Sequence, residues 1–540
     1  MVRLVCERSA FLEALESRVL LSSGPVTIGD ANSAAARSLV YSDPDGTIVT
    51  VGLKYGQATI DLGDDWTWEV TNGVARGAVR STIHSVTLAD TGVRSRLTFR
   101  TAKPRGAAGA EADTRATVAG ITGTGLGQLV AGAIDLLGAG IDVAGIKSCR
   151  VGRVLDGASL AFGGAATDSM TFSALDVHGS QLTFAGSVRR LTVEEWLDGG
   201  GVAASRVGKV QATSGGFTAD VVAPEGIGPV AVTGGDLEGS LTAEQGPIGN
   251  ITVKGTAVFT MDGEQGQGEV RGGRILSAEI RAGGAVKGRS IGAISAIGIG
   301  SQDAAVAIFG AGDVGKITTR GRRYKASREV VAGRAETSFD YRAADVFASV
   351  TASGRLGAIS VAGGDLVGQF DAASVGNVTV VVATPRGVPG RFGGGLSGQI
   401  ISDTTIGAVL AVGGDMELSL SAGTRLSAVR LKCVTVPAGL ERGPGGNWVA
   451  SSGSALGTLM DLTINLGVAD PSAIGAITAL GADIALHGSV PFEPPPADVL
   501  AESRVITYVS DYDPDPETGR PVAVYSTVGG HVTGELTHAT

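Results

Sequence analysis

The residues best suited to chemistry in this sequence lie near its C-terminus, where acidic side chains stand at every second position: Asp511, Asp513, Asp515 and Glu517. Carboxylates spaced in this way supply the oxygen ligands that Ca²⁺ prefers. A calcium loop of the EF-hand type has a glycine after its third acidic position, and Pro516 stands there in this chain. We therefore predict no cofactor, with these four residues as the metal candidates should Ca²⁺ bind.

Two further pairs of residues, two aspartates and two tryptophans, can each be interpreted either as a binding site or as part of the fold. Asp43 and Asp45 offer only two carboxylates to a cation that takes six to eight oxygens, and they flank Pro44 and precede Gly46 as in a hairpin turn. We favour the turn over a calcium site. Trp66 and Trp68 alternate and would suit sugar stacking, although packing in a core or cap is the favoured interpretation.

No arrangement of acid, base and nucleophile converges in the sequence. The five histidines are scattered, at positions 84, 178, 487, 531 and 537, and no acidic pair recurs in register. The three cysteines, Cys6, Cys149 and Cys433, lack the clustered spacing of a zinc site, and we expect the last two to be small buried side chains. The sequence therefore predicts no catalytic residues and a protein that is not an enzyme.

The elements that must position any site come from a repeat, which is best seen in residues 227–243. Val230 and Val232 alternate with smaller or polar residues at the period of a half-buried strand. Gly234 and Gly235 then allow a left-handed backbone, and Asp236 can bond to neighbouring backbone as turn aspartates do. One unit thus comprises two short strands and two turns.

Copies of this unit recur at intervals near twenty residues. A hydrophobic–glycine pair marks them at positions 126, 151, 207, 227, 248, 291, 314, 356, 375, 406, 456 and 474, with Leu426–Ser427 as a degenerate copy. The glycine–glycine–aspartate turn recurs at three sites: Gly234, Gly235 and Asp236; Gly363, Gly364 and Asp365; and Gly413, Gly414 and Asp415. This self-similarity predicts an all-β fold, a single-stranded parallel β-helix or β-solenoid with a small N-terminal β cap and a C-terminal hairpin.

Composition agrees with narrow stacked turns. Glycine makes up 85 of 540 residues and aromatics only 4%, so Val, Ile, Leu and Ala must fill the interior. The net charge of −10 argues against nucleic acid as a partner. The most apolar window, residues 126–146, is interrupted by Gln128, Asp135 and Asp142, so we expect no transmembrane segment.

Changes in composition and residue pattern along the chain predict four parts. Residues 1–24 form an N-terminal segment, 25–115 a β-rich cap with a linker, 116–490 the repeats, and 491–540 a proline-rich break followed by a hairpin. The longer intervals between copies contain either a degenerate coil of the solenoid or loops that project from it. Three such excursions, residues 261–269, 320–341 and 384–392, are where binding would lie, although none carries a catalytic pattern and each suits a tolerated insertion. The basic cluster within residues 320–325 is expected to be a solvated loop.

The N-terminal segment is amphipathic and lacks the continuous apolar core of a secretory signal. Residues 13–22 resemble the LEPR-XLL segment that begins large surface or exported proteins of planctomycete bacteria, with Ser17 where the motif has proline. The matching positions, taken as the sorting motif, are Leu15, Glu16, Arg18, Leu20 and Leu21. The repeats also look like those of these proteins. The resemblance implies export to the cell surface or beyond.

Together these features predict a non-catalytic, structural or adhesive β-solenoid of the cell surface. Its expected partner is a component of the cell envelope or the extracellular space, either polysaccharide or protein. The alternative is a carbohydrate-active β-helix enzyme of the lyase or hydrolase kind, which would need carboxylates and a stacking aromatic within about 10 Å in one groove.

Overall fold

The structure is a computed structural model of the 540-residue chain. It describes residues 22–29, 36–63, 66–104, 113–155, 157–164, 169–262, 265–277, 279–331, 334–386, 388, 392–432, 434–435, 440–442, 448–450, 455–456, 459–466, 474–480, 483–490, 526–528, 532–534 and 537–538. Every regular element in these residues is a β-strand, which confirms the predicted all-β class. The chain divides into two compact units, residues 1–186 and 187–540.

The first unit begins with antiparallel strands and continues with parallel ones. Its antiparallel pairs include β3 with β4, β4 with β9, β2 with β5 and β5 with β8. Strand β8 then pairs in parallel with β10, and β9 pairs in parallel with β11. Strands β8 and β9 therefore each have an antiparallel neighbour on one side and a parallel neighbour on the other. The bounds are β1 Ser22–Ser23, β2 Val26–Gly29, β3 Ser38–Ser42, β4 Ile48–Lys54, β5 Gln57–Asp61, β6 Thr67–Thr71, β7 Val74–Arg80, β8 Ser85–Ala89, β9 Arg96–Ala102, β10 Ala116–Gly123, β11 Leu126–Val143, β12 Ile146–Val154, β13 Ser159–Phe162, β14 Ser169–Ser173, β15 Asp176–His178 and β16 Gln181–Phe184.

Both tryptophans of the N-terminal strands belong to the core of this unit. Trp66 is 1% exposed and Trp68 is 8% exposed, with the Trp68 indole nitrogen donating to the Gly24 carbonyl at 3.0 Å. The packing interpretation is therefore confirmed, and the sugar-stacking alternative is wrong because a ligand cannot reach either ring. Cys149 is buried as expected, and burial raises the pKa of its thiol.

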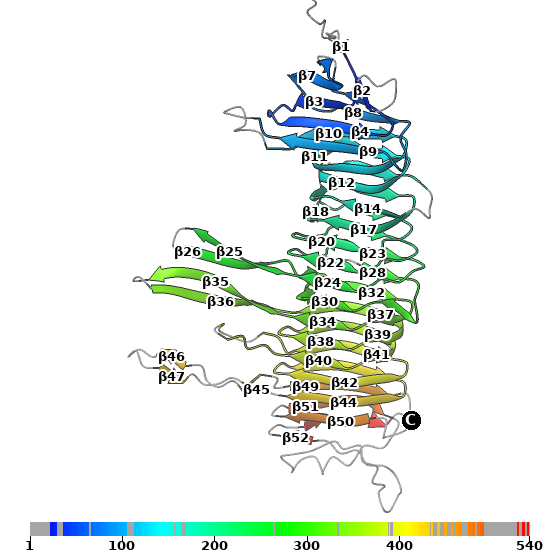
Figure 1. Ribbon diagram of the computed structural model, residues 1–540. Coiled ribbons are helices and arrows are strands. Elements are labelled where there is room, and N and C mark those ends of the chain that lie inside the picture. The colour runs from blue at the N-terminus through cyan, green and yellow to red at the C-terminus, as the bar shows by residue number, and fades with distance from the viewer. Residues whose placement is uncertain are drawn as a thin grey trace, which may run out of the picture. The chain divides into compact units, whose positions relative to one another are not determined.

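In the second unit, each repeat pairs in parallel with the repeat before and after it (Figure 1). The first strand of every repeat forms one ladder, in which Val210, Val230 and Ile251 are direct partners. The strands of this first ladder are β17 Ser187–Val193, β20 Val210–Ala212, β22 Val230–Thr233, β24 Ile251–Lys254, β30 Ile294–Ala296, β34 Ile317–Arg320, β38 Ile359–Ala362, β40 Val378–Val381, β42 Thr405–Val412, β44 Arg425–Lys432 and β50 Ile474–Leu480.

The second strand of each repeat forms another parallel ladder, in which Val221, Leu241 and Ile280 are partners. The strands of this second ladder are β19 Gly201–Ala203, β21 Asp220–Val222, β23 Leu241–Ala243, β28 Glu279–Ala282, β32 Val306–Gly310, β37 Val346–Leu356, β39 Leu366–Val375, β41 Leu396–Ser402, β43 Met416–Ala422, β49 Leu459–Leu466 and β51 Asp483–Val490. The short strands β18 Glu195–Leu197, β27 Arg274–Ile275, β29 Arg289–Ile291, β31 Gly298–Ile299 and β33 Asp313–Val314 lie between the ladders in sequence.

In the second unit, the hydrophobic residues of most hydrophobic–glycine pairs form a corner column that joins successive repeats. Val207, Ile227, Ile248 and Ile291 are bridged in this order, and all four are buried. The column continues from Ile406 to Leu426 and then to Ile474, which confirms the degenerate copy at Leu426. Leu456 is not in the column. It lies in β48 (Ala455–Leu456) and pairs antiparallel with Val434, so the expected copy at that position is wrong.

At the C-terminal end, short strands add to the same ladders. β52 (Ser526–Val528) pairs in parallel with β50, and β53 (Val532–Gly534) and β54 (Thr537–His538) pair in parallel with β51. The expected hairpin around residues 504–526 lies outside the described residues, apart from the first residue of β52.

Candidate functional site: the excursion face

The chain bends between strands at the three glycine–glycine–aspartate sites. Gly234, Gly363 and Gly413 have φ of 82°, 76° and 80°, in the left-handed region where a side chain clashes with the backbone. The second glycine of each turn is needed for another reason. A Cβ on Gly235 would lie 2.0 Å from the Gly216 nitrogen, and one on Gly414 would lie 2.1 Å from the Gly394 carbonyl carbon. These glycines permit successive repeats to approach closely.

Two of the three aspartates, Asp236 and Asp365, bond to the following repeat. Asp236 Oδ1 accepts the Arg274 backbone N–H at 2.7 Å, and Asp365 Oδ1 accepts that of Gly395 at 2.9 Å. Burial, opposed by the Gly395 hydrogen bond, raises the pKa of Asp365. Each bond satisfies a backbone donor where the chain returns to the stacked strands after an excursion.

The long intervals between copies contain excursions that leave the stacked strands after a strand of the first ladder. The first excursion is the hairpin of β25 (Thr256–Asp262) and β26 (Gln265–Arg271). The second is the hairpin of β35 (Arg322–Val331) and β36 (Arg334–Arg342). The third consists of residues 383–392, where Ala383 and Phe392 form an antiparallel bridge. In Figure 1 the hairpins project from one side of the stacked strands of this unit.

A fourth excursion follows β44 and contains two short antiparallel pairs. β45 (Val434–Thr435) pairs with β48, and β46 (Leu440–Arg442) pairs with β47 (Trp448–Ala450). It leaves from the same ladder as the other three, so one corner of the repeat accommodates every large insertion that is described.

The first two hairpins join into one four-stranded sheet. Gly266 pairs with Arg328 and Gln267 with Ser327, which links β26 to β35 although the hairpins follow strands that are two repeats apart, β24 and β34. The expectation that these excursions are loops is therefore wrong, as is the expectation of a solvated loop at residues 320–325. Alternating residues such as Tyr324, Phe339 and Tyr341 suit strands, and a second hairpin supplies the backbone partners that an isolated hairpin lacks.

One face of this sheet alternates aromatic rings with cations. Arg323 pairs with Tyr341 and Lys325 with Phe339, so strand alternation places all four on one side. The Arg323 guanidinium carbon lies 3.6 Å from the Phe339 ring centroid, and Lys325 Nζ lies 4.0 Å from that of Phe259. We call Phe259, Arg323, Lys325, Phe339 and Tyr341 the excursion face.

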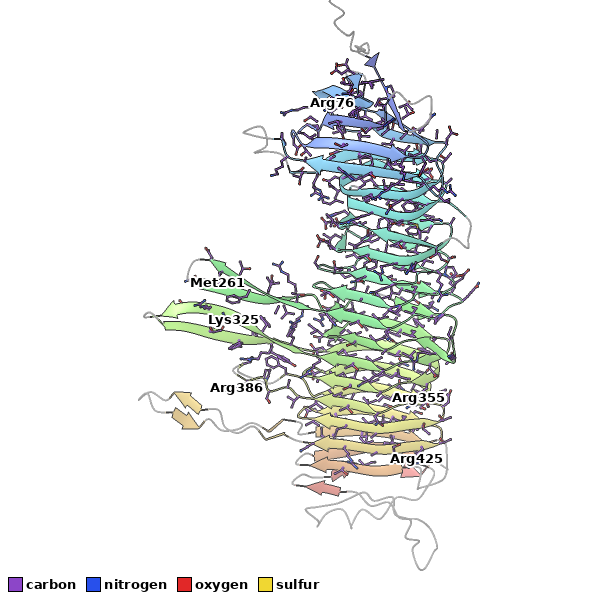
Figure 2. The ribbon with its side chains drawn as sticks, in the orientation of Figure 1. Arg76, Met261, Lys325, Arg355, Arg386 and Arg425 are labelled. Atoms are coloured by element: carbon purple, nitrogen blue, oxygen red, sulfur yellow. The ribbon has the colours of Figure 1, made fainter. Side chains whose placement is uncertain are left out.

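Glycines beneath the face leave room for its rings. A Cβ on Gly266 or Gly268 would lie 2.5 Å or 2.9 Å from the Phe259 ring, so that ring covers the bare backbone of the neighbouring strand. Such covering of strand glycines by an aromatic ring stabilises a sheet that would otherwise lose packing. Met261 lies beyond Phe259 with 45% of its surface exposed, and Figure 2 shows Met261 and Lys325 on the projecting hairpins.

The third excursion extends the same face toward the stacked strands. The Tyr341 and Phe392 rings are 4.6 Å apart at 38°. Tyr341 also covers two glycines, since a Cβ on Gly363 would lie 1.9 Å from its hydroxyl and one on Gly321 would lie 2.2 Å from it. Burial raises the pKa of Tyr341. Residues from three separate excursions are thus brought together.

The opposite face of the sheet fixes its position. Arg322 Nη1 donates to the Gly255 carbonyl and Arg342 Nη1 to the Val270 carbonyl, the latter at 2.5 Å. These bonds tie the base of the second hairpin to the base of the first. Farther out, Tyr324 donates to Asp340 Oδ2 at 3.0 Å, and burial followed by this bond raises the pKa of Tyr324.

The excursion face is suited to binding rather than bond cleavage. A guanidinium or ammonium held over a ring keeps its outward donors available for carboxylate, sulfate or phosphate groups, while the ring edges offer apolar contact. Its five residues include no carboxylate and no histidine. Sequence reasoning identified the excursions as the place to search but missed this face, because the β26–β35 register is not visible from either hairpin alone.

A second cluster of charged groups lies in the first unit, around the turn at Asp43. Asp43 is 6% exposed, and its Oδ1 has no partner in the described residues. Burial, followed by the charge of Asp45, raises the pKa of Asp43 from 3.8 to about 7. Although burial alone would raise the pKa of Asp45, hydrogen bonds from Asp113 and Thr47 hold it below its usual value. The turn is confirmed by the Asp43 N–H bond to the Thr47 carbonyl at 2.8 Å.

Asp135 explains how the apolar window tolerates a charge. Arg115 Nε bonds to Asp135 Oδ1 at 2.6 Å, and Arg153 Nε bonds to the same oxygen at 2.9 Å. The hydrogen bond to Asp135 raises the pKa of Arg153. The described residues include no helix of the length and apolarity that a membrane span requires.

Several predicted residues cannot be placed. The metal candidates Asp511, Asp513, Asp515 and Glu517 lie outside the described residues, as do Leu15, Glu16, Arg18, Leu20 and Leu21 of the sorting motif and Cys6 and Cys433. Within the residues that are described, no group of three or more His, Cys, Asp or Glu side chains is arranged to hold a metal ion.

Comparison with known proteins adds no family assignment to this geometry. Searches of protein-family models, curated proteins and solved structures gave no significant match.

Proposed function

We propose that the chain is a non-catalytic, adhesive β-solenoid of the cell surface that binds an envelope or extracellular component through the excursion face. The observation that carries this proposal is the convergence of three excursions on one aromatic–cationic surface. Insertions retained only because they are tolerated have no reason to pair with one another. A paired, tethered sheet presents its side chains in fixed positions, as an adhesive surface requires.

The body that holds this surface is proposed to be a single-stranded parallel β-helix. Two ladders and a corner column that advance by one repeat at each step support this architecture. Stacked repeats of this kind contact only their neighbours, so a projecting hairpin can be added without rearranging the core.

The surface chemistry favours an acidic polysaccharide over a neutral one. Arg323 and Lys325 can pair with carboxylates, while Phe259 and Phe339 supply the apolar contact that sugar rings make with aromatic side chains. A protein segment rich in Asp and Glu would satisfy only the charges. An acidic glycan pairs with the cations and also contacts the aromatic rings.

Binding to immobilised polygalacturonate, with dextran as the neutral control, tests the proposal. We expect the full chain to bind polygalacturonate, and the double variant Arg323→Ala and Lys325→Ala to bind about tenfold more weakly, which corresponds to about 1.4 kcal/mol. Arg271→Ala is the matched control, because Arg271 lies on the opposite face, paired with Glu269 at 2.6 Å. Unchanged binding by the double variant, or equal loss in the control, would refute the role of the excursion face.

Export is proposed from the LEPR-XLL-like segment alone. Cell fractionation with mass spectrometry of the native N-terminus tests it directly. We expect the chain in the envelope or medium fraction, whereas an intact Met1 in the cytosol would overturn the assignment.

A carbohydrate-active enzyme is the second candidate, and the opposed pKa shifts of Asp43 and Asp45 are the observation that favours it. The geometry weighs against it, since Asp43 Oδ1 is shut off from solvent and both Asp45 oxygens accept hydrogen bonds. Incubation with polygalacturonate should release no new reducing ends. Release that is abolished by Asp43→Asn would establish the enzyme instead.

A further inference from the structure

A basic hollow lies on the outer face of β4 and β9 in the first unit, separate from the excursion face. It is an open cavity of about 300 Å³ that four cationic side chains line, Arg37, Lys54, Arg96 and Arg100, with the hydroxyls of Thr50 and Thr98 among them. No acidic residue lines it. In a chain with a net charge of −10, four cations around one hollow require an explanation.

The strand register builds this hollow. Thr50 pairs with Arg100, Gly52 with Thr98 and Lys54 with Arg96 across the antiparallel ladder. Strand alternation turns Val49 and Val51 into the core, where both are fully buried, and leaves the polar set outside. Arg37 joins it from the residue before β3.

The register also violates an electrostatic rule of sheets. Lys54 and Arg96 are direct cross-strand partners of like charge, an arrangement that destabilises a ladder. Among the residues that the structure describes, no carboxylate forms an ion pair with any of the four cations. Lys54 Nζ lies 4.8 Å from the Tyr55 ring centroid, but this contact does not neutralise its charge. A local electrostatic cost that no carboxylate of the described residues offsets is typical of a binding site.

Gly52 forms the open floor of the hollow. No atom lies within 4 Å of the position that its Cβ would take, so no neighbour requires a glycine here. Glycine weakens a strand interior, and in strands it often marks a site where a ligand approaches the backbone. The missing side chain leaves the space between the cations empty.

We propose that this hollow binds a ligand carrying two or more sulfate or phosphate groups. A single carboxylate would neutralise one of the four positive charges and leave the repulsion between Lys54 and Arg96 in place. Guanidinium groups bind tetrahedral oxyanions through paired N–H donors, and the threonine hydroxyls can donate to the remaining oxygens. The ligand is a free small polyanion or a group borne on a polymer, and both present the same chemistry.

Calorimetric titration of the full chain in 150 mM salt distinguishes these sources. The probes are pyrophosphate, dextran sulfate and neutral dextran. Gly52→Val fills the floor, keeps every charge and suits a strand, so stability should be retained while binding falls at least tenfold. Arg96→Gln should weaken binding similarly. Arg94→Gln is the matched control, because Arg94 is exposed nearby but does not line the hollow.

Each outcome decides the proposal. Binding of pyrophosphate that Gly52→Val and Arg96→Gln weaken, and Arg94→Gln does not, supports a small ligand. The same pattern with dextran sulfate alone supports a polymer-borne group. No binding of either polyanion, binding unchanged in Gly52→Val, or equal weakening in all three variants would overturn the site. Weakening of either probe by Gly52→Val should persist in the double variant of the excursion face, which separates the two surfaces.

Discussion

Glycine meets two different physical demands in the repeat. Gly234 adopts a left-handed backbone, which any side chain would strain. Gly228 does not, yet a Cβ there would lie 1.8 Å from the Gly208 carbonyl oxygen of the preceding repeat. The glycine of the hydrophobic–glycine pair is therefore required because two successive repeats approach closely at the corner column.

This difference predicts the effect of adding one methyl group. Gly228→Ala should destabilise the second unit by about 3 kcal/mol, because the neighbouring backbone must move away. Gly216→Ala is the matched control in an adjacent repeat, since its Cβ would meet the nearest atom at an ordinary 3.6 Å. Urea unfolding of both variants measures the two costs. Equal costs would contradict the close-approach explanation.

Asp43 makes the stability of the first unit depend on pH. Its pKa in the folded chain is about 7, above its ordinary value of 3.8, because burial disfavours the charged form. Below pH ~4 the group is protonated in both folded and unfolded states, so it costs nothing. As the pH rises toward 7, the folded state must retain the proton or bury a charge, and stability falls by up to about 1.4 kcal/mol per pH unit.

Asp43→Asn should remove this dependence, because the amide is neutral at every pH. We expect the variant to gain stability relative to the unaltered chain between pH 4.5 and pH 8, as measured by urea unfolding followed by tryptophan fluorescence. Other titrating groups are common to both proteins and cancel in the comparison. Parallel pH profiles would show that Asp43 is not the responsible group.

At the scale of elements, the two ladders hold the repeats together while the excursions carry the surface chemistry. The first and last residues of each hairpin are direct partners, Thr256 with Arg271 and Arg322 with Arg342. The stacked strands therefore continue from neighbouring points on either side of each hairpin. A strand of the first ladder does not depend on what is inserted after it.

Removal of both hairpins, residues 256–271 and 322–342, should therefore leave the ladders intact. We expect the far-ultraviolet circular dichroism of the deletion variant to remain that of a β protein and its melting temperature to change by only a few degrees. Binding to polygalacturonate should disappear. A deletion variant that fails to fold would mean that the excursion sheet is a structural part of the unit, while a folded variant that still binds would place the adhesive surface elsewhere.

At the scale of the whole molecule, the local charge of the two cationic surfaces is opposite in sign to the net charge. The chain is acidic overall, yet cations collect at the excursion face and in the basic hollow of the first unit. A distant polyanion is repelled by the net charge and attracted only at short range. Selectivity then depends on how the anionic groups are spaced, since charge alone brings no polyanion to the surface.

The sequence by itself determined the repeat and the all-β class. The alternation at Val230 and Val232, the left-handed glycine at Gly234 and the hydrophobic–glycine pair at Ile227 are local patterns with a local physical cause, and each occupies its expected position. The same logic placed Trp66 and Trp68 in the core. Repetition reinforced each of these signals, which is why single degenerate copies such as Leu426 could still be recognised.

Only the tertiary structure decided which distant residues become neighbours. The pairing of Gly266 with Arg328 and the placement of Lys54 opposite Arg96 depend on the register between strands that are far apart in the chain. The false copy at Leu456 shows the same limit, because a short motif does not encode its partner. Register is set by the combined packing of many side chains, so both cationic surfaces emerge from the fold and neither can be read from a motif.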